Sequence, residues 1–381
     1  MAHPPSPAAP ATPLECDDLL AEILLRLPPH PASLARASLV CTRWRRLARD
    51  PAFLRRLRAL HRAPPVLGFF HNSPCSPRFL SCAAPGGSRS PGRLARAAAA
   101  LRRDADDGVW WLADCRRGRA LLRARDWAEL LVWDPVAAER REIPAPRRLR
   151  GGASCCNAAV LGPAAADDDC RSGAFRVVVV FTTQRRAFAC VYSSAAGSWG
   201  EPVSAEMPSS TCELSEEPGA LAGNALYWLL GDSSILEFHL GDQRLALVER
   251  PLEIFGIYKR NIRVVKSEGG GLGIAAADNF SLHLWAREID HDGTAKWVLH
   301  KAIDLCALLA LPSAQPRVGP IPVWISGLGE DGNVVFLRTM VGIFVVWLET
   351  MQFKNVTNSV LMKTVYPYAS FYVPGEFDSG L

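Results

Sequence analysis

The 381-residue sequence contains no apolar run that approaches 18 residues, so we expect no membrane-spanning helix. The N-terminal stretch MAHPPSPAAPATP lacks the basic and apolar regions of a secretory signal, and we expect none. The eleven cysteines are odd in number and scattered, and the sequence has no Cys-x-x-Cys pair or Cys/His cluster at metal-ligand spacing. We therefore predict no metal site, no cofactor and no membrane partner, and a reducing compartment: cytoplasm, nucleus or both.

The sequence also has little excess of charge, with 43 Lys and Arg against 38 Asp and Glu. Residues 1–62 hold 10 arginines and 5 acidic residues, so residues 63–381 carry equal numbers of basic and acidic residues. This balance argues against nucleic-acid binding by the larger part of the chain, because such binding needs a basic surface.

A helical segment over residues 14–60 is the most informative part of the sequence. The acidic pair Asp17 and Asp18 suits the start of a first helix, and Pro28 with Pro29 ends it. The apolar side chains of that helix share one face: Leu19, Leu20, Ile23, Leu24 and Leu27. Pro31 is expected to start a second helix, and the apolar periodicity continues through a third: Leu34, Leu39, Val40, Trp44 and Leu47.

Asp50 and Pro51 are typical of the cap and first residue of a fourth helix. Four short helices in under 50 residues form a core of marginal size, because a small domain buries only about 60% of its unfolded surface. Apolar side chains left outside that core favour association, so the segment predicts a docking partner.

The segment reads L-x-x-D-D-L-L-x-E-I-L-x-R-L-P-P, then R-A-S-L-V-C-x-R-W-R-R-L, then D-P-x-F-L-R-R. This pattern resembles the F-box, although Glu15 and Cys16 stand where many F-boxes have Leu-Pro. The resemblance implies docking on a Skp-type adaptor, which links indirectly to a cullin and a RING subunit of a ubiquitin ligase. It also implies an adaptor-facing set, some of it shared with the internal core: Leu14, Leu19, Leu20, Ile23, Leu24, Leu27, Pro28, Leu39, Val40, Cys41 and Trp44.

Two other interpretations of the segment stay open. The helices could be the packed start of a larger domain, or a helix-turn-helix module whose arginines meet phosphates. The TRWRRLARD stretch offers arginines around Trp44 but few side chains suited to base edges, and a solvated basic face explains those arginines equally well.

After residue 62 the sequence changes to short apolar strands separated by turn-rich loops. A unit of several strands recurs five times, with VLGFF at 66–70 and RFLSC at 78–82 as a further partial unit. One aromatic residue marks the centre of each complete unit: Trp133, Tyr192, Phe238, Trp285 and Trp347. An irregular period near 50 residues resembles kelch-type propeller repeats.

The predicted fold is α+β multidomain, with a small helical F-box followed by an all-β propeller of about six blades. The predicted organisation is a disordered leader (1–12), an F-box (13–62) and a kelch-like propeller (63–381). The layout also resembles the F-box-associated propellers abundant in plants, particularly grasses. The C-terminal YASFYV is expected to complete the first blade and close the ring, while a two-sheet sandwich is the alternative.

No catalytic set is predicted. GGGLG at 269–273 lacks a Gly-Lys-Ser/Thr ending and is expected to be a turn, and Asp167 to Asp169 either bind a cation or lie in a solvated loop. The vicinal Cys155 and Cys156 are expected to be structural rather than redox-active. His283, His291 and His300 lack ligand spacing and are expected at the surface.

Recognition then falls to the propeller loops, because loops vary without disturbing the blades. Candidate loops are 114–119, 162–173, 182–186, 231–234, 278–281 and 329–332. Candidate contacts to a target are Arg185, Arg186, Asp232, Asn279 and Phe280.

The sequence thus predicts a non-catalytic, substrate-recognition subunit of a Skp-cullin-F-box ubiquitin ligase, with an unidentified target protein. The alternatives are a non-degradative F-box scaffold, a propeller enzyme and a DNA-binding protein.

Overall fold

The computed structural model of the protein describes residues 14, 16–27, 31–61, 64–82, 90–101, 108–151, 155–162, 174–183, 185–208, 213–231, 234–309 and 323–370. The described residues fall into two compact units, one built from the first four helices and one from the strands. The predicted leader at 1–12 lies outside the described residues, and the predicted domain boundaries remain predictions.

The first unit contains four short helices in the predicted order: α1 (Asp17–Leu25), α2 (Pro31–Ser38), α3 (Thr42–Arg49) and α4 (Pro51–His61). Asp50 caps α4, since its Oδ1 accepts the Ala52 and Phe53 N–H groups at 2.8 and 2.9 Å. The core of this unit comes from all four helices: Leu20, Ala21, Leu24, Leu25, Leu34, Ala37, Ala48, Phe53 and Leu57.

Two details of the predicted helices need correction. Leu27 follows the end of α1, and Leu39 and Val40 lie in the turn between α2 and α3 rather than inside a helix. Apolar periodicity did not reveal the breaks, because a turn residue can keep the spacing of the helix before it.

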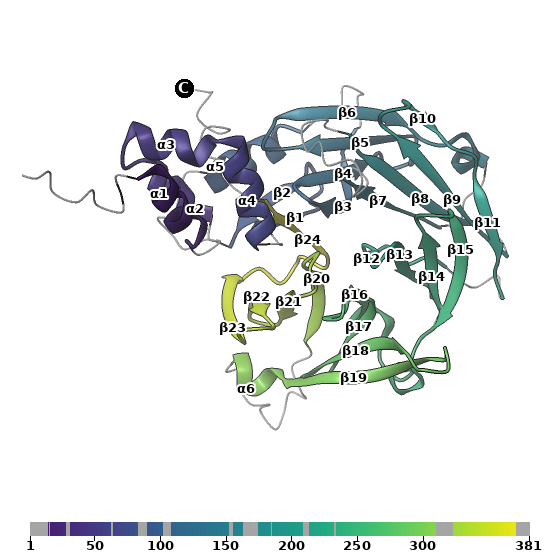
Figure 1. Cartoon of the computed structure of the whole chain (residues 1–381). Coiled ribbons are helices and arrows are strands. Elements are labelled where there is room, and N and C mark those ends of the chain that lie inside the picture. The colour runs from purple at the N-terminus through teal and green to yellow at the C-terminus, as the bar shows by residue number, and fades with distance from the viewer. Residues whose placement is uncertain are drawn as a thin grey trace, which may run out of the picture. The chain divides into compact units, whose positions relative to one another are not determined.

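Six antiparallel sheets make up the second unit and form the blades of a β-propeller (Figure 1). Blade 1 combines β24 (Val365–Ala369), β1 (Val66–His71) and β2 (Arg78–Ser81). Blade 2 contains β3 (Trp111–Arg116), β4 (Arg119–Arg123), β5 (Glu129–Asp134) and β6 (Glu139–Pro144). Blade 3 contains β7 (Cys155–Leu161), β8 (Arg176–Thr183), β9 (Arg186–Ser193), β10 (Ser198–Trp199) and β11 (Val203–Glu206).

Blade 4 contains β12 (Ala220–Ala222), β13 (Ala225–Leu229), β14 (Ser234–His239) and β15 (Arg244–Glu249). Blade 5 contains β16 (Ile262–Lys266), β17 (Leu272–Asp278), β18 (Ser281–Ile289) and β19 (Ala295–Asp304). Blade 6 contains β20 (Trp324–Leu328), β21 (Val334–Thr339), β22 (Gly342–Trp347) and β23 (Gln352–Thr357). Helices α5 (Ser90–Ala99) and α6 (Leu305–Leu309) lie in blade connections, as do the short 3-10 helices η1 (Arg147–Gly151), η2 (Leu252–Ile254) and η3 (Lys259–Asn261).

Six apolar clusters fill the spaces between the six neighbouring pairs of blades. The cluster between blades 6 and 1, for example, packs Phe336 of β21 against Phe69 of β1, with ring centroids 5.2 Å apart. A sheet that buries both faces against its neighbours needs a closed ring of sheets. The predicted propeller of about six blades is therefore confirmed, and the two-sheet sandwich is excluded.

The ring closes where β24 pairs with β1, with Val66 opposite Ala369 and His71 opposite Val365. The prediction that a C-terminal strand completes blade 1 is confirmed, but the strand is Val365–Ala369 and shares only Tyr368 and Ala369 with the expected YASFYV. The strand begins earlier than expected because Val365 and Tyr366 pack into the apolar clusters on either side of blade 1, while Tyr368 contacts Phe70 and Phe79 at centroid distances of 5.3 and 6.2 Å.

The aromatic residues used to align the repeats all occupy the third strand of their blade, namely β5, β9, β14, β18 and β22. Trp133, Tyr192 and Phe238 are buried, whereas Trp285 and Trp347 are half-buried. The predicted alignment is thus confirmed, while the kelch-type classification of the repeats remains a prediction.

Candidate functional site

One candidate site is an exposed apolar face on the four-helix unit. Leu19 and Ile23 lie one turn apart on α1 and are 50% and 41% exposed, and Leu39 and Val40 are 73% and 62% exposed. Leu14 and Cys41 are exposed as well. We call this set the apolar face: Leu14, Leu19, Ile23, Leu39, Val40 and Cys41. All its members belong to the predicted adaptor-facing set.

Arg43 joins the two parts of the apolar face. Its Nε lies 2.7 Å from Asp17 Oδ1, and its Nη1 donates a hydrogen bond of 2.8 Å to the Leu14 carbonyl. These contacts hold the start of α1 beside the start of α3, where Cys41 and the α2–α3 turn lie. The surface is therefore set before any partner binds.

The other members of the predicted adaptor-facing set lie differently. Leu20 and Leu24 are 0% and 1% exposed, so they serve the internal core and offer no surface to a partner. Leu27 and Trp44 are half-buried against that core, and Pro28 lies outside the described residues. Helical periodicity groups Leu20 with Leu19, but only the packing of α1 on the other helices decides which one is covered.

Glu22 of α1 holds the helices together beside this face. Its carboxylate pairs with Arg26, at 2.6 Å, and with Arg56 of α4. Hydrogen bonds from Arg26 and Arg56 lower the pKa of Glu22, although the side chain is at the surface. The pair with Arg56 links α1 to α4, and the sequence alone did not indicate it.

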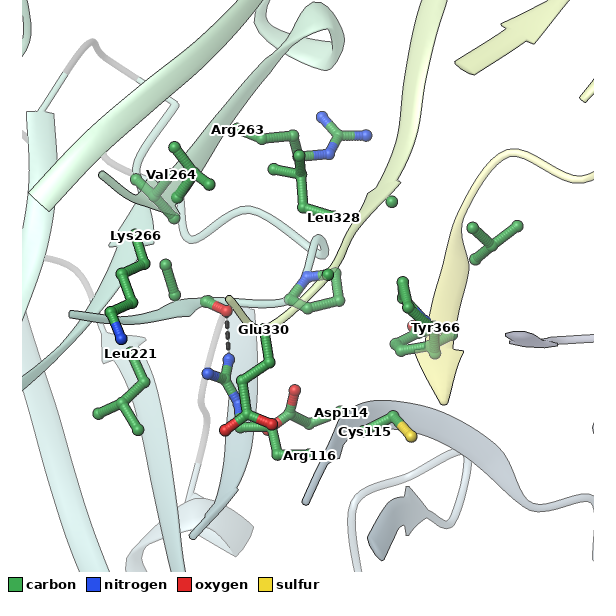
Figure 2. A pocket seen from close by; sticks show the side chains of 18 of the residues that line it. Asp114, Cys115, Arg116, Leu221, Arg263, Val264, Lys266, Leu328, Glu330 and Tyr366 are labelled. Atoms are coloured by element: carbon green, nitrogen blue, oxygen red, sulfur yellow. Dashed lines mark hydrogen bonds and ion pairs between the residues drawn. The ribbon is translucent and has the colours of Figure 1, made fainter. Parts of the chain in front are cut away.

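The second candidate site is the central channel of the propeller. The innermost strands border a cavity of about 60 Å³, enough for a few water molecules (Figure 2). Asp114, Arg116 and Glu330 gather at one end of it in Figure 2, and Arg263 lies towards the other. Residues of the predicted ranges 114–119 and 329–332 therefore contribute to the cavity lining, but Asp114 to Arg116 belong to strand β3, so the loop predicted at 114–119 is only the turn of Arg117 and Gly118.

Most charged side chains in the channel form hydrogen bonds or ion pairs that connect one blade to another. Arg116 Nε lies 2.7 Å from Asp114 Oδ2, which also accepts the Val160 N–H at 3.0 Å, and Arg116 donates to the Gly219 carbonyl. The side chains of Asp114 and Arg116 are both buried. Burial raises the pKa of Asp114, whereas the Arg116 guanidinium acts in the opposite direction.

A second pair crosses from blade 5 to its neighbours. Arg263 Nη2 lies 3.0 Å from Glu217 Oε1 and donates a 2.8 Å hydrogen bond to the Ile325 carbonyl of β20. Burial lowers the pKa of Arg263, and Glu217 opposes that effect. Tyr366 completes the link between blades 1 and 2 by donating to the Leu112 carbonyl at 2.9 Å. The channel pairs thus act as structural connections.

The predicted chemical motifs are placed as follows. GGGLG forms the turn between β16 and β17, in which the Ser267 N–H donates to the Gly271 carbonyl at 2.9 Å. Cys155 and Cys156 lie on β7, and burial raises the pKa of Cys156 to about 12. Asp167 to Asp169 lie outside the described residues. Within the described ranges, no group of three or more His, Cys, Asp or Glu side chains could hold a metal ion.

Strand direction separates the propeller loops into two faces. We call one the connection face, because it carries the links between blades and the turns between second and third strands; the other is the turn face. The described residues of ranges 182–186, 231–234 and 278–281 lie at the connection face, and those of 114–119 and 329–332 lie at the turn face, although the ends of most of these ranges belong to strands. Of the sixth candidate loop, only residue 162 is described.

The described target contacts, Arg185, Arg186, Asn279 and Phe280, lie at second-to-third-strand turns or at the strand end beside them, and so belong to the connection face. Arg185, Arg186 and Asn279 are exposed, but Arg185 already donates to the Pro208 carbonyl and Arg186 to Ser204 Oγ. Phe280 packs partly into the apolar cluster between blades 5 and 6. Asp232 lies outside the described residues, and a target contact by any of the five remains a prediction.

A four-helix unit followed by a six-bladed propeller is the arrangement of one class of protein, the F-box proteins with a propeller domain. Residues 17–59 match the model of the F-box-like family, and residues 111–374 match the family described as F-box protein AT5G49610-like, beta-propeller. The chain belongs to this family of F-box proteins. F-box proteins with a β-propeller are generally non-catalytic adaptors, and the combination of domains fits a substrate-receptor role.

No curated protein matches the chain. Among solved structures, the chain is similar to the BT4673 extracellular domain from B. thetaiotaomicron, with 13% identity and a TM-score of 0.36, covering 68% of this chain and 29% of that one. A Bacteroides thetaiotaomicron VPI-5482 protein of unknown function shares 14% identity at a TM-score of 0.39, with 70% and 65% covered. The Dos1 propeller shares 10% identity at a TM-score of 0.38, with 77% and 68% covered.

The chain spans less than two thirds of the length of the first of these structures, and TM-scores below 0.5 support no argument about function. In the described part of the protein, no helix is long and apolar enough to cross a membrane.

Proposed function

We propose that the protein is the substrate-recognition subunit of a Skp-cullin-F-box ubiquitin ligase. The F-box binds a Skp-type adaptor, which brings in the cullin and the RING subunit, and the propeller binds the target protein. The protein itself performs no covalent step, since its contribution is to hold the target near the conjugating machinery.

The observation that supports this proposal best is the apolar face. Its leucine, isoleucine and valine side chains remain between 41% and 73% exposed, although the same small unit buries nine others. Fully burying one such side chain contributes about 1.5 to 3 kcal/mol, so covering the exposed parts of five contributes several kcal/mol. An apolar, preorganised surface on an F-box is what an adaptor interface requires.

A pull-down with a purified Skp-type adaptor tests the assignment. We expect Leu19→Asp with Ile23→Asp to weaken adaptor binding at least ~100-fold, because two charges would replace two buried apolar contacts. Both positions are exposed in the free protein, so the fold should survive.

Leu60→Asp is the matched control. Leu60 is a 55% exposed leucine on α4 of the same unit and lies outside the predicted set. Undiminished adaptor binding by the Leu19/Ile23 variant, or an equal loss with Leu60→Asp, would contradict the proposed interface.

The ligase role and the scaffold role differ in what happens to the bound target. As a ligase receptor, the intact chain should shorten the lifetime of a captured target, and deletion of 14–60 should restore it. A target whose lifetime does not respond to that deletion would favour a non-degradative scaffold. We also propose residence in the cytoplasm, the nucleus or both, where cullin-based ligases would be met.

A further inference from the structure

The connection face carries a cluster of arginines near the inner ends of blades 5 and 6. Arg260 of η3, Arg263 of β16 and Arg338 of β21 form this arginine cluster. Arg263 Nη1 donates a 2.8 Å hydrogen bond to the Arg260 carbonyl, and the Arg260 charge acts on Arg338. The three residues are therefore close in space although two blades supply them.

Negative charge around this cluster is scarce. Arg263 pairs with Glu217, but Arg260 and Arg338 have no ion pair with a carboxylate among the described residues. Arg338 instead lies over the Trp324 ring, at 4.3 Å from its centroid, and donates to the Val360 carbonyl at 3.3 Å. Burial and the neighbouring Arg260 charge both lower the pKa of Arg338, as expected for a cation without a counter-ion.

Two buried donors in the cluster are also unused. The Nε atoms of Arg263 and Arg338 are buried and make no hydrogen bond within the described structure. Buried guanidinium groups are normally satisfied by acceptors, so both Nε–H groups leave hydrogen-bonding capacity unused, as does the buried Oδ1 acceptor of Asn261, which follows Arg260 in η3.

Large apolar side chains are exposed in the segments that carry these arginines or bond to them. The connection between blades 4 and 5 exposes Leu252, Phe255 and Tyr258 by 78%, 52% and 60%. Met340 follows Arg338 by two residues and is 58% exposed, and Leu361 follows Val360 and is 85% exposed. Aromatic, methionine and arginine side chains are the types enriched in binding hot spots.

Charge complementarity selects the kind of occupant. Residues 250–261 contain Arg250, Lys259 and Arg260 against the single carboxylate of Glu253. A basic partner would add to the repulsion between the arginines, whereas an acidic one would supply the missing counter-charge. An apolar residue beside the acid would cover the exposed leucine, methionine and aromatic side chains.

We propose that this part of the connection face binds an acidic peptide segment of the target, in which Asp or Glu side chains meet Arg260 and Arg338 and an adjacent apolar residue packs on Tyr258, Met340 and Leu361. This inference rests on the proposed function and names the chemistry of its substrate. It places recognition on blades 4 to 6, apart from the earlier candidates Arg185 and Arg186 on blade 3.

Peptide selection on the intact protein tests the proposal. The full-length chain, without added adaptor, is used to select from a library of random 12-residue peptides displayed on phage. We expect the selected pool to be enriched in Asp or Glu next to Leu, Met or an aromatic residue. Binding of a resynthesised peptide should weaken about tenfold with Arg260→Glu in the protein, and similarly with Glu→Gln in the peptide.

The controls separate surface from fold. Arg140→Glu, an exposed arginine on the outer strand of blade 2, should leave peptide binding unchanged. Arg338→Lys keeps the charge but not the planar guanidinium, and should weaken binding even where Arg338→Ala fails to fold.

Three results would overturn the inference: no enrichment, an enriched pool without acidic residues, or equal binding to wild type and Arg260→Glu. Binding of a phosphoserine peptide whose glutamate counterpart does not bind would also overturn it, in favour of phosphate recognition. Adaptor binding is measured separately on the same preparation. If the peptide prediction fails, the receptor proposal still stands. If the chain does not bind the adaptor, the peptide result is unaffected.

Discussion

Closure of the propeller depends on a single C-terminal strand, and this makes Tyr368 a sensitive position. Tyr368 of β24 is fully buried between Phe70 of β1 and Phe79 of β2. We expect Tyr368→Ala to destabilise the propeller, because the substitution leaves a cavity where the first and last segments of the ring meet.

The magnitude follows from the burial. Truncation of a fully buried large aromatic side chain costs about 3 to 5 kcal/mol, of which the aromatic contacts contribute about 0.5 to 1.5 kcal/mol each. For a domain of about 300 residues the unfolding entropy is about 0.6 kcal/mol/K, so that loss corresponds to a fall in unfolding midpoint of roughly 5 to 8 °C. Without β24, β1 would also expose its unpaired edge, so we expect greater aggregation.

The measurement is thermal unfolding followed by circular dichroism at several heating rates, since large proteins can unfold irreversibly. Tyr258→Ala is the matched control, because Tyr258 is 60% exposed and its truncation should change the midpoint by no more than about 1 °C. A change below 2 °C for Tyr368→Ala would refute the reasoning that the ring is closed by a packed strand.

Three further predictions concern the helical unit and the thiols. Asp50→Ala should destabilise the unit by about 1 kcal/mol, because it removes both N-cap hydrogen bonds of α4, and Asp50→Ser should restore most of that in chemical denaturation. The pKa of Glu22 is lowered in the folded state. The stabilisation that its ion pairs give the fold is therefore present above the ordinary pKa of 4.5 and is lost as the pH falls through the folded-state pKa. Glu22→Gln should abolish that part of the acid dependence in denaturation curves recorded over a series of pH values. Alkylation at pH 8 followed by mass spectrometry should show that the exposed Cys41 reacts and that Cys156, whose pKa is raised by burial, does not. Bound adaptor should protect Cys41. Reaction of Cys156 in the native protein would contradict its assignment as a structural thiol.

Local signals in the sequence were sufficient for several elements. Asp50 followed by Pro51 correctly predicted the start of α4, because capping depends on residues only two or three positions apart. The aromatic residues of the third strands correctly aligned the blades, because each blade repeats the same strand order. These features need no knowledge of the rest of the fold.

Other strands have a sequence pattern that is too weak to predict their place in a blade. The innermost strands of blades 3 to 5 are examples: β12 has only three residues, and β7 and β16 are buried along most of their length. These strands are short or buried on both faces, so they lack the alternation that marks a half-buried strand. Their positions depend on pairing with a neighbouring strand and on packing around the channel.

The candidate sites show the same division. The F-box pattern indicated the helical docking unit, but Leu20 and Ile23 are both apolar residues of one predicted face, and only packing placed the first inside and the second outside. Likewise, Arg260 and Arg338 are 78 positions apart in the sequence, and no pattern relates them. The ring brings them together.

By itself, the sequence determined the class of the protein: a helical F-box, a repeating β-domain of about six blades, and no recognisable catalytic set. Those properties follow from residue type and spacing along the chain, which act over a few residues or repeat at a regular interval. Only the tertiary structure decided which leucines stay exposed, which strand closes the ring, which loops share a face and which arginines gather away from the carboxylates of the described residues. Each of these depends on contacts between residues that are distant in the chain, and burial is a property of the folded whole.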